Sequence, residues 1–392
     1  MVVTADTKSE GPTENKTAYT RTNPFHAKVL VNINLNKPGS SKETRHIELS
    51  LKDSGLSYGP GDCVGIIPEN DPELVEAILE EMKWDAEQAV VIGKTGETLP
   101  LKQALLTYFE ITLLTKKILQ NAAALTENEE LKVLVDAENA AQLKEYINGR
   151  DLLDMLRDFG PWNASAQDVV SLLRKIPPRL YSIASSLTAH PDEVHLTIGA
   201  VRYNAHGRER KGVCSVLCAE RLDEGETLPL FVQANKHFNL PEEQETDIIM
   251  VGPGTGIAPF RSFIQERAAN GASGRSWLFF GDQHSSTDFL YQTELENYQK
   301  EGVLTKLDTA FSRDTEQKVY VQHKMLENSK ELYEWLEKGA YFYVCGDKQY
   351  MAKDVHETLL AILQKEGGMT AEEAEAHLKD MQKQKRYQRD VY

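Results

Sequence analysis

Residues 248–260 read IIMVGPGTGIAPF, and this stretch decides how the second half of the chain folds. The apolar run 248–251 is typical of a buried parallel strand, and the pattern turns helical from Arg261 onward. Between them lie three glycines, Gly252, Gly254 and Gly256. A strand that ends in glycines and opens a helix presents bare backbone N–H groups to which a pyrophosphate can bind closely. Because the spacing G-x-G-x-G departs from the usual G-x-G-x-x-G, a plain tight turn is an alternative interpretation.

A regular alternation of strands and helices surrounds this stretch. Residues 277–280 and 341–344 are short apolar strands, each soon followed by a glycine, with helical patterns between and after them. Such alternation favours a doubly wound parallel sheet. We assign residues 241–392 to this α/β domain.

The first part of the chain has an antiparallel pattern instead. Period-two alternation and turn residues predict three early strands, at residues 26–35, 45–51 and 63–68. Three more strands follow two consecutive prolines, at residues 179–184, 193–201 and 227–232. We interpret all six as one antiparallel β-barrel that another region interrupts.

The interruption has helical periodicity. Leu101, Ala104, Leu105 and Tyr108 share one helical face, and a helix is also predicted from Asp71-Pro72 through Met82. We expect a barrel domain over residues 23–100 and 176–240 and an all-helical insertion over residues 101–175. Residues 1–22 are polar with almost nothing to bury, which is typical of a linker or hinge. The expected fold class is therefore α+β followed by α/β.

Composition excludes several classes of protein. A chain of 392 residues with 41% hydrophobic and 27% charged residues is expected to form two or three globular domains. The net charge of -16 argues against a nucleic-acid partner. No apolar run or signal-peptide pattern predicts a membrane span or export. The four cysteines are too scattered for a disulfide framework or a metal site, so we expect a reduced, cytoplasmic protein without metal.

Two short segments of the barrel carry groups that suit a phosphate. Arg179-Leu180-Tyr181-Ser182 combines a cation, an aromatic ring and a hydroxyl, and alternation places Arg179 and Tyr181 on one face of the strand. A barrel strand with a surface arginine is the plainer interpretation. Residues 211–215 read KGVCS and open a helix, so Gly212 and the N–H groups behind it predict a second anion site.

Four motifs resemble those of the ferredoxin–NADP⁺ reductase superfamily. In chain order they are Arg-x-Tyr-Ser, Gly-Val-Cys-Ser, Gly-Pro-Gly-Thr-Gly-Ile-Ala-Pro-Phe and Tyr-Val-Cys-Gly-Asp. The helical insertion and the ending Arg386–Tyr392 are similar to those of the diflavin reductases. Within these, residues 23–392 most resemble the flavoprotein component of NADPH-dependent sulfite reductases. The resemblance implies a barrel that binds FAD and an α/β domain that binds NADPH.

The resemblance also implies which residues contact FAD. Arg179 binds its phosphate, Tyr181 stacks on the isoalloxazine ring, and Ser182 lies near the nitrogen that accepts hydride. Residues 212–215 match the family's pyrophosphate turn, and Thr115 matches a peripheral contact. The full implied set is Thr115, Arg179, Leu180, Tyr181, Ser182, Thr197, Ile198, Gly199, Tyr203, Gly212, Val213, Cys214 and Ser215.

For NADPH, the resemblance implies that Ser312 and Arg313 read the adenosine 2′-phosphate. Their chemistry agrees, because a dianionic phosphate needs cations and hydroxyls, whereas an NAD enzyme would place an acid there. An ordinary polar loop is the alternative interpretation. The other implied contacts are Gly254, Thr255, Lys318, Val319, Tyr320, Val321, Gln322 and Asp354.

Four residues are implied to serve the hydride step. Ser182, Cys345 and Asp390 match the family's polar trio, and we expect them to orient the nicotinamide rather than form a covalent intermediate. Cys345 also ends a predicted parallel strand, where ligands of α/β domains bind. The terminal Tyr392 matches an aromatic gate that covers the flavin until NADPH displaces it. We interpret Cys63 and Cys218 as packing residues.

One departure concerns the electron acceptor. The family's reductases carry an N-terminal flavodoxin-like FMN domain, for which the polar residues 1–22 leave no room. We expect that domain to have been removed or to be a separate chain. The resemblance implies transfer through it to a sulfite reductase hemoprotein (beta) subunit, which reduces sulfite to sulfide in cysteine biosynthesis. The alternatives are a reductase for a cytochrome or nitric oxide synthase-type acceptor, a non-catalytic flavin-binding docking module, and a plain α/β protein without cofactor.

Overall fold

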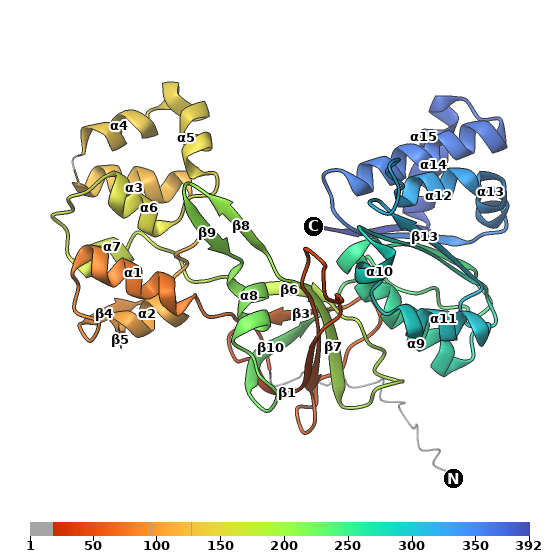
Figure 1. The fold of residues 1–392 in the computed structure, drawn as a ribbon, viewed down its shortest axis with the longest axis horizontal. Helices are drawn as coiled ribbons and strands as arrows, with labels where there is room; N and C mark the ends of the chain where they lie inside the picture. The colour runs from red at the N-terminus through yellow and green to blue at the C-terminus, as the bar shows by residue number, and fades with distance from the viewer. Residues whose placement is uncertain (1–18, 95, 127) are drawn as a thin grey trace, which may run out of the picture.

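The computed structural model describes residues 19–94, 96–126 and 128–392. Most of the expected linker, residues 1–18, lies outside the described residues. The described part consists of a β-barrel, a largely helical region and an α/β domain (Figure 1). The barrel lies in the middle, between the helical region and the α/β domain.

The expected antiparallel barrel is confirmed. Its six strands pair antiparallel throughout, in the order β6-β3-β10-β1-β2-β7. A further antiparallel bridge between Ile183 and Leu196 joins the two ends of this order and closes the barrel. The strands are β1 (Phe25–Asn34), β2 (Thr44–Ser50), β3 (Cys63–Ile66), β6 (Arg179–Ser182), β7 (Glu193–Gly199) and β10 (Thr227–Gln233).

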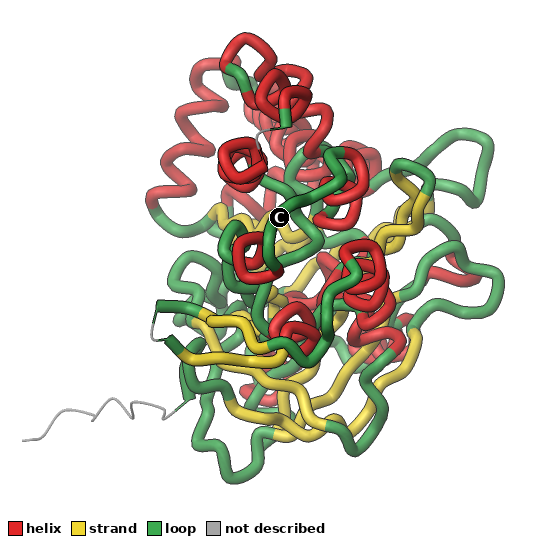
Figure 2. The backbone as a smooth tube through the Cα atoms, turned by 90° about the vertical axis from the view of Figure 1, so that its left-hand side faces the viewer, coloured by secondary structure: helices red, strands yellow, loops and turns green. Residues whose placement is uncertain are grey.

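Alternation along the strands builds the barrel core. Ala27 and Val29 of β1 and Ile47 and Leu49 of β2 point inward and are almost fully buried. Helix α8 (Val213–Glu220) adds Cys214, Leu217 and Cys218 to the same core. The barrel strands lie at the bottom of Figure 2, and most of the helices lie above them.

The helical region contains more than the expected insertion. Its core joins Val75 and Ile78 of α1 and Val90 and Ile92 of a β-hairpin to the helices after Leu101. Because residues 72–100 pack here and not in the barrel, we propose that this structural unit begins at residue 72. Its elements are α1 (Pro72–Met82), β4 (Ala89–Ile92), β5 (Glu97–Pro100), α2 (Leu101–Thr107), α3 (Lys116–Thr126), α4 (Glu129–Val135), α5 (Ala140–Ile147), α6 (Leu152–Asp158) and α7 (Ala166–Val170).

A second hairpin, β8 (Arg202–Ala205) and β9 (Arg208–Lys211), reaches from the barrel to the helical region. Arg208 and Arg210 form ion pairs of 2.5 to 2.8 Å with Asp151 and Asp154, which together cap α6. These ion pairs are largely buried, and Arg210 is only 6% exposed. The hairpin therefore ties the two regions together.

The doubly wound parallel sheet is also confirmed. All neighbouring strands run parallel, in the order β13-β12-β11-β14-β15. The chain order reverses between β11 and β14, the place where ligands of such sheets bind. The strands are β11 (Ile248–Val251), β12 (Ser276–Asp282), β13 (Lys306–Phe311), β14 (Tyr341–Gly346) and β15 (Tyr387–Val391).

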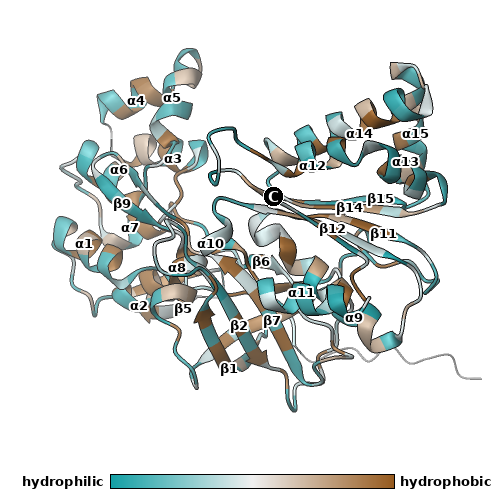
Figure 3. Ribbon diagram, turned by 45° about the vertical axis from the view of Figure 1, so that its right-hand side comes forward, coloured by the Kyte–Doolittle hydropathy of each residue, from teal (hydrophilic) through white to brown (hydrophobic). Residues whose placement is uncertain are grey.

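Helices cover both faces of this sheet (Figure 3). Ile249 and Val251 of β11 pack against one set, and Ile248 and Met250 pack against the other, as period-two alternation requires. The first set is α12 (Val321–Glu327), α13 (Ser329–Glu337), α14 (Met351–Gly367) and α15 (Ala371–Lys383). The second is α9 (Ala258–Asn270), α10 (Ser285–Asp288) and α11 (Gln292–Lys300). Among the described helices, none is both long and apolar enough to cross a lipid bilayer.

Candidate functional site

A cavity of about 1320 Å³ lies where the barrel meets the carboxyl ends of the parallel strands. Both domains line it. From the barrel come Arg179, Leu180, Tyr181, Ser182, Thr197, Gly199 and residues 212–215. From the α/β domain come Gly254, Thr255, Ser312, Tyr320, Val321, Gln322, Asp354, Asp390 and Tyr392. Most of the residues predicted from the sequence are thus brought to one place.

The glycine-rich stretch forms the predicted strand, turn and helix. After β11, residues Gly254–Ile257 make one 3-10 turn, η2, and α9 follows directly. Gly254 has φ +56°, a backbone conformation that L side chains rarely adopt. A Cβ on Gly256 would lie 2.2 Å from the carbonyl oxygen of Cys345, so this glycine lets the turn pack against β14. One glycine therefore provides the turn and another the close packing.

The predicted trio converges at the carboxyl ends of β6, β14 and β15. The hydroxyl of Ser182 donates a 2.6 Å hydrogen bond to Oδ2 of Asp390. The thiol of Cys345 lies 4.0 Å from the same oxygen, because Cys345 and Asp390 are partners in the β14–β15 pairing. Burial raises the pKa of Asp390, and the Ser182 hydrogen bond partly opposes this. Burial also raises the pKa of Cys345, so its thiol stays protonated.

Cys63, which we expected to be only a packing residue, is a fourth polar group at this position. It lines the cavity, and it is the antiparallel partner of Ser182 in the β3–β6 pairing. Burial and the nearby Asp390 carboxylate raise the pKa of Cys63 to about 12. The strand pairing that places Cys63 here is a long-range contact, which a local sequence pattern does not reveal.

Tyr392 stands at the edge of the cavity with its side chain mostly exposed. Its hydroxyl lies 2.9 Å from Oγ1 of Thr255 on η2. Its backbone is held at both ends, because its N–H donates to Gly346 O and its carbonyl accepts from Lys348 N. The terminal residue is therefore anchored to the loop after β14, while the residue as a whole remains 64% exposed.

On the barrel side, the Arg179 guanidinium is already held by the protein. It donates to the Glu110 carboxylate at 3.1 Å and to the Pro177 carbonyl at 2.6 Å. Glu110 is fully buried, and its other oxygen accepts from the N–H and the hydroxyl of Thr112. Nothing in the local pattern around Glu110 predicts this role, because its partner is 69 residues away.

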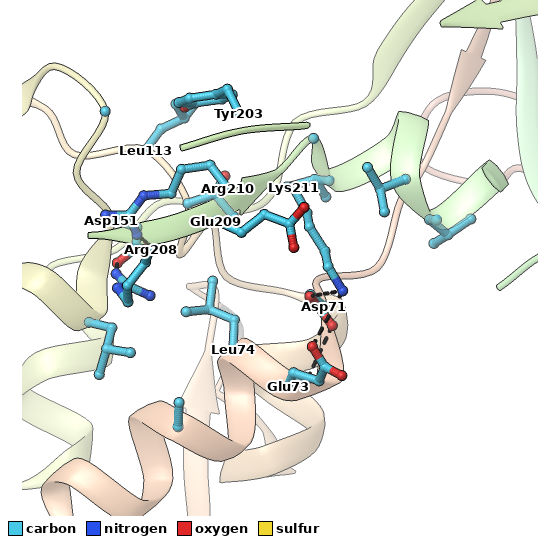
Figure 4. Close-up of a pocket in the computed structure, with 18 of the residues that line it drawn as sticks. Asp71, Glu73, Leu74, Leu113, Asp151, Tyr203, Arg208, Glu209, Arg210 and Lys211 are labelled. Atoms are coloured by element: carbon cyan, nitrogen blue, oxygen red, sulfur yellow. Dashed lines mark hydrogen bonds and ion pairs between the residues drawn. The ribbon is translucent and has the colours of Figure 1, made fainter. Parts of the chain in front are cut away.

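A second cavity of about 540 Å³ lies beside the first, between hairpin β8–β9 and the helical region (Figure 4). The two cavities share Arg179, Gly212 and Val213 in their walls. Tyr203 and Leu113 lie along one side, and both are nearly half exposed. On the opposite side, Lys211 forms ion pairs with Asp71 and Glu73. Tyr203 therefore lies in this smaller cavity and not in the larger one.

Two predicted flavin contacts have other surroundings, and a third, Thr197, lines the larger cavity but is bonded to the α/β domain. Thr115 lines neither cavity, and its hydroxyl accepts a hydrogen bond from Ile118 N in the first turn of α3. The Ile198 side chain is fully buried in the barrel core. Thr197 is also buried, and its hydroxyl lies 2.6 Å from the hydroxyl of Tyr291. The Thr115 side chain therefore bonds to the start of α3, the Ile198 side chain packs in the barrel core, and the Thr197 side chain lies at the interface between domains.

The predicted nucleotide residues of the α/β domain lie after β13 and on α12 and α14. Gln322 donates a 3.1 Å hydrogen bond to Asp354, which joins the two helices. Arg313 and Lys318 are exposed, and neither makes a side-chain hydrogen bond or ion pair among the described residues. Val319 is partly buried against the core under α12. The sequence analysis missed Lys42, which crosses from the barrel to Asp282 at 2.5 Å, and the 74% exposed Tyr350 on the cavity wall.

Comparisons with known proteins identify two domain families in the chain. The family described as "FAD binding domain" matches residues 18–217, half of the chain, and "Oxidoreductase NAD-binding domain" matches residues 250–357. A sulfite reductase [NADPH] flavoprotein alpha-component from Bacillus subtilis (strain 168) is 66% identical over 377 residues, which are 96% of this chain and 62% of that protein. The corresponding protein of Klebsiella pneumoniae is 47% identical over 95% of this chain and 62% of its own length.

Both relatives are longer than this chain, which spans about 62% of each. The matched FAD-binding segment begins at the edge of the described barrel and includes the helical region, hairpin β8–β9 and the start of α8. The matched NAD-binding segment starts within β11 and ends within α14. The chain therefore belongs to the family of FAD-binding domains, and it is an oxidoreductase whose second half is an NAD-binding domain.

Proposed function

We propose that the chain is an NADPH-dependent flavin reductase module in which NADPH reduces FAD. When bound, FAD accepts a hydride from NADPH and can release its electrons one at a time. The observation that carries this proposal is the meeting of Ser182, from the barrel, with Cys345 and Asp390, from the α/β domain. A polar cluster built from both nucleotide-binding domains is expected where the two cofactors react.

The residues of the barrel fit FAD. Arg179 and the N-terminal N–H groups of α8, which is eight residues long, suit a pyrophosphate. A Cβ on Gly212 would lie 2.5 Å from Oγ of Ser215 and 3.1 Å from Cβ of Val201, so a larger residue here would displace the Ser215 hydroxyl and crowd Val201. We place the isoalloxazine ring near Ser182 in the larger cavity. Arg179 and Tyr203, which line the smaller cavity, would hold the adenosine end of FAD, with the Tyr203 ring stacking on it.

The residues of the α/β domain fit a nucleotide with a 2′-phosphate. Arg313 and Lys318 are exposed cations without a side-chain partner in the described part of the chain, and Ser312 lines the cavity beside them. Such cations favour the binding of a phosphate group, because they need not first break a hydrogen bond or ion pair within the protein. We propose that they select NADPH over NADH, with Tyr320, Gln322 and Asp354 as further contacts.

We propose that Ser182, Asp390 and Cys345 orient the nicotinamide. Oδ2 of Asp390 accepts the 2.6 Å hydrogen bond from the Ser182 hydroxyl and so fixes its direction, and the Cys345 thiol remains a neutral donor. Tyr392 covers the reaction position and leaves when the nicotinamide enters. Its 2.9 Å contact with Thr255 supports this role, because one hydrogen bond of a mostly exposed ring is readily exchanged for a ligand.

Beyond this step, we propose that electrons pass to an FMN-containing, flavodoxin-like domain and then to a sulfite reductase hemoprotein (beta) subunit. The support is the 66% identity to a sulfite reductase flavoprotein component over 96% of this chain. We also propose a cytoplasmic location, with which four unpaired cysteines are compatible. A cytochrome or nitric oxide synthase-type acceptor would use the same NADPH and FAD sites, so the partner alone separates these alternatives.

The first experiment is an anaerobic titration of the FAD-loaded chain with NADPH and, separately, with NADH. We expect NADPH to bleach the flavin band and NADH to do so only at far higher concentration. A flavin that neither nucleotide reduces would favour the non-catalytic docking module. The acceptor is tested next, by adding a purified FMN domain and the hemoprotein subunit and measuring sulfide, with cytochrome c as the competing acceptor.

A further inference from the structure

Helix α9 contacts both halves of the proposed reaction site. Its N-terminus follows η2, which contains Thr255, the partner of Tyr392. Along its side it faces residues 184–188 of the barrel, which begin two residues after Ser182. One helix therefore connects the segment beside Tyr392 with the segment after Ser182.

Arg261 makes the largest set of these contacts. Its Nη1 donates to the carbonyl oxygen of Ala184 at 2.7 Å and lies 3.2 Å from Nδ1 of His195. Its Nε donates to the Glu294 carboxylate on α11 at 2.9 Å. The guanidinium also lies 4.8 Å from the ring centroid of Tyr291. With 7% exposure, this cation is enclosed by groups from both domains.

The groups around Arg261 are themselves fixed. Because Nδ1 of His195 accepts from Arg261, the ring hydrogen sits on Nε2, which lies 3.0 Å from the Glu193 carboxylate. Tyr291 has φ +55°, an uncommon conformation for a residue with a side chain. Its hydroxyl contacts Nδ1 of His46 at 3.0 Å and Oγ1 of Thr197 at 2.6 Å, so α11 is held to strands β2 and β7.

The rest of the contact consists of hydrogen bonds between α9 side chains and the backbone and side chains of residues 185–188. The Ser262 hydroxyl donates to the carbonyl oxygen of Ser185 at 2.7 Å, and Gln265 accepts from the N–H of Ser186 at 3.0 Å. Ser186 also donates its hydroxyl to Glu266 at 2.5 Å. The hydrogen bonds between α9 and the backbone fix the path of residues 184–186. Because strand β6, which carries Ser182, leads directly into this segment, its end is fixed as well.

We propose that Arg261 is a positioning residue for hydride transfer: by holding α9 on the Ala184 segment, it fixes the distance between nicotinamide and flavin. This role rests on the proposed NADPH-to-FAD reaction. Arg261 does not line the larger cavity, so it acts through the backbone and not by touching a cofactor. A displacement of about 1 Å between reacting atoms can cost on the order of 100-fold in rate.

The test compares Arg261→Gln with Arg267→Gln. Arg267 is a buried arginine on the same helix, but it donates to the carbonyls of Thr246 and Gly274, within its own domain. Both variants lose a buried cation, so both are expected to lose stability. Only Arg261→Gln should alter the reaction, with Arg261→Lys recovering part of the rate through the bond to Ala184 O.

The readouts are the Kd of NADPH, the limiting rate of anaerobic flavin reduction and its primary deuterium isotope effect. For Arg261→Gln we expect about a 10-fold slower limiting rate, a Kd within about twofold, and a larger isotope effect. Arg267→Gln should keep the wild-type rate. Should Arg261→Gln fail to fold, Ser262→Ala provides the same test, with an expected slowing of about threefold.

Two results would overturn this role in distinguishable ways. Equal reduction rates for wild type, Arg261→Gln and Arg267→Gln would show that Arg261 has no positioning role and would leave the proposed function intact. If Arg261→Gln does not fold, a wild-type reduction rate in Ser262→Ala would lead to the same conclusion. A wild-type protein that binds FAD and is not reduced by NADPH would overturn both.

Discussion

The barrel and the α/β domain hold the cations that we propose for phosphate binding in opposite ways. In the barrel, Arg179 is bonded to the buried Glu110 and to a backbone carbonyl before any ligand arrives. In the α/β domain, Arg313 and Lys318 extend from a loop into solvent without a side-chain partner among the described residues. The first arrangement is preorganised and the second is adaptable.

The difference corresponds to two kinds of ligand. A preorganised cation loses little conformational entropy on binding, which favours a cofactor that stays bound. Exposed cations lose more on binding and are screened by salt, which favours a substrate that must leave after each turnover. We therefore infer that the barrel retains FAD while the α/β domain exchanges NADPH.

Arg179→Ala tests the preorganised side and should have the largest effect. We expect FAD affinity to fall by about 100-fold, which corresponds to about 3 kcal/mol, measured by fluorescence of released flavin. Stability should fall as well, by roughly 3 kcal/mol, because Glu110 is left buried without its cation. The double variant Arg179→Ala/Glu110→Gln should regain stability without regaining FAD. If Arg179→Ala bound FAD with wild-type affinity, the proposal that Arg179 is a preorganised FAD contact would be wrong.

Arg313→Ala tests the adaptable side. We expect the Kd of NADPH to rise by about 10- to 100-fold, because a charged contact to the 2′-phosphate is lost, while the Kd of NADH changes by less than about twofold. The melting temperature should not change, since the side chain is exposed. Added salt should reduce the difference between wild type and variant. Equal losses for the two nucleotides would contradict the assignment.

Asp390→Asn tests the position where the two sides meet. Because burial raises the pKa of Asp390 above its ordinary 3.8, the carboxylate becomes protonated at a higher pH than an exposed aspartate. The limiting rate of flavin reduction should therefore fall on acidification, starting above pH 3.8. Asp390→Asn should lower the rate by about 10-fold at neutral pH and abolish this acid limb.

The stability of the same variant checks the sign of the shift. A carboxyl group with a raised pKa in the folded state is destabilising when it is ionised, so Asp390→Asn should not lower the melting temperature at neutral pH. A large loss of stability would indicate that Asp390 holds the strand β15 rather than serving the reaction.

Tyr392→Ala should have the smallest effect. If the ring covers the position that nicotinamide takes, its removal increases the fraction of binding-competent protein and lowers the Kd of NADPH by about fivefold. Thr255→Val removes only the hydrogen bond to the ring and should lower the Kd by about twofold. Unchanged or weaker binding in Tyr392→Ala would show that the ring contributes to the nucleotide site instead of competing for it.

Much of the architecture is visible in the sequence because it depends on local patterns. The apolar run 248–251 with its glycines predicts strand, turn and helix, and period-two alternation predicts the barrel strands. The boundary near residue 100 was less predictable. Residues 89–100 form a hairpin whose apolar side chains, Val90 and Ile92, are buried against helices, and alternation alone does not say which core a strand faces.

The sequence by itself determined the two folds and the glycine turn, because these follow from residue type and order, and its resemblance to known reductases pointed to Ser182, Cys345 and Asp390. Only the tertiary structure decided which groups meet. It paired Arg179 with Glu110, set Cys63 opposite Ser182, and enclosed Arg261 between Ala184 and Glu294. Each of these contacts joins residues far apart in the chain, and such partners are chosen by strand pairing and domain packing, which no local pattern encodes.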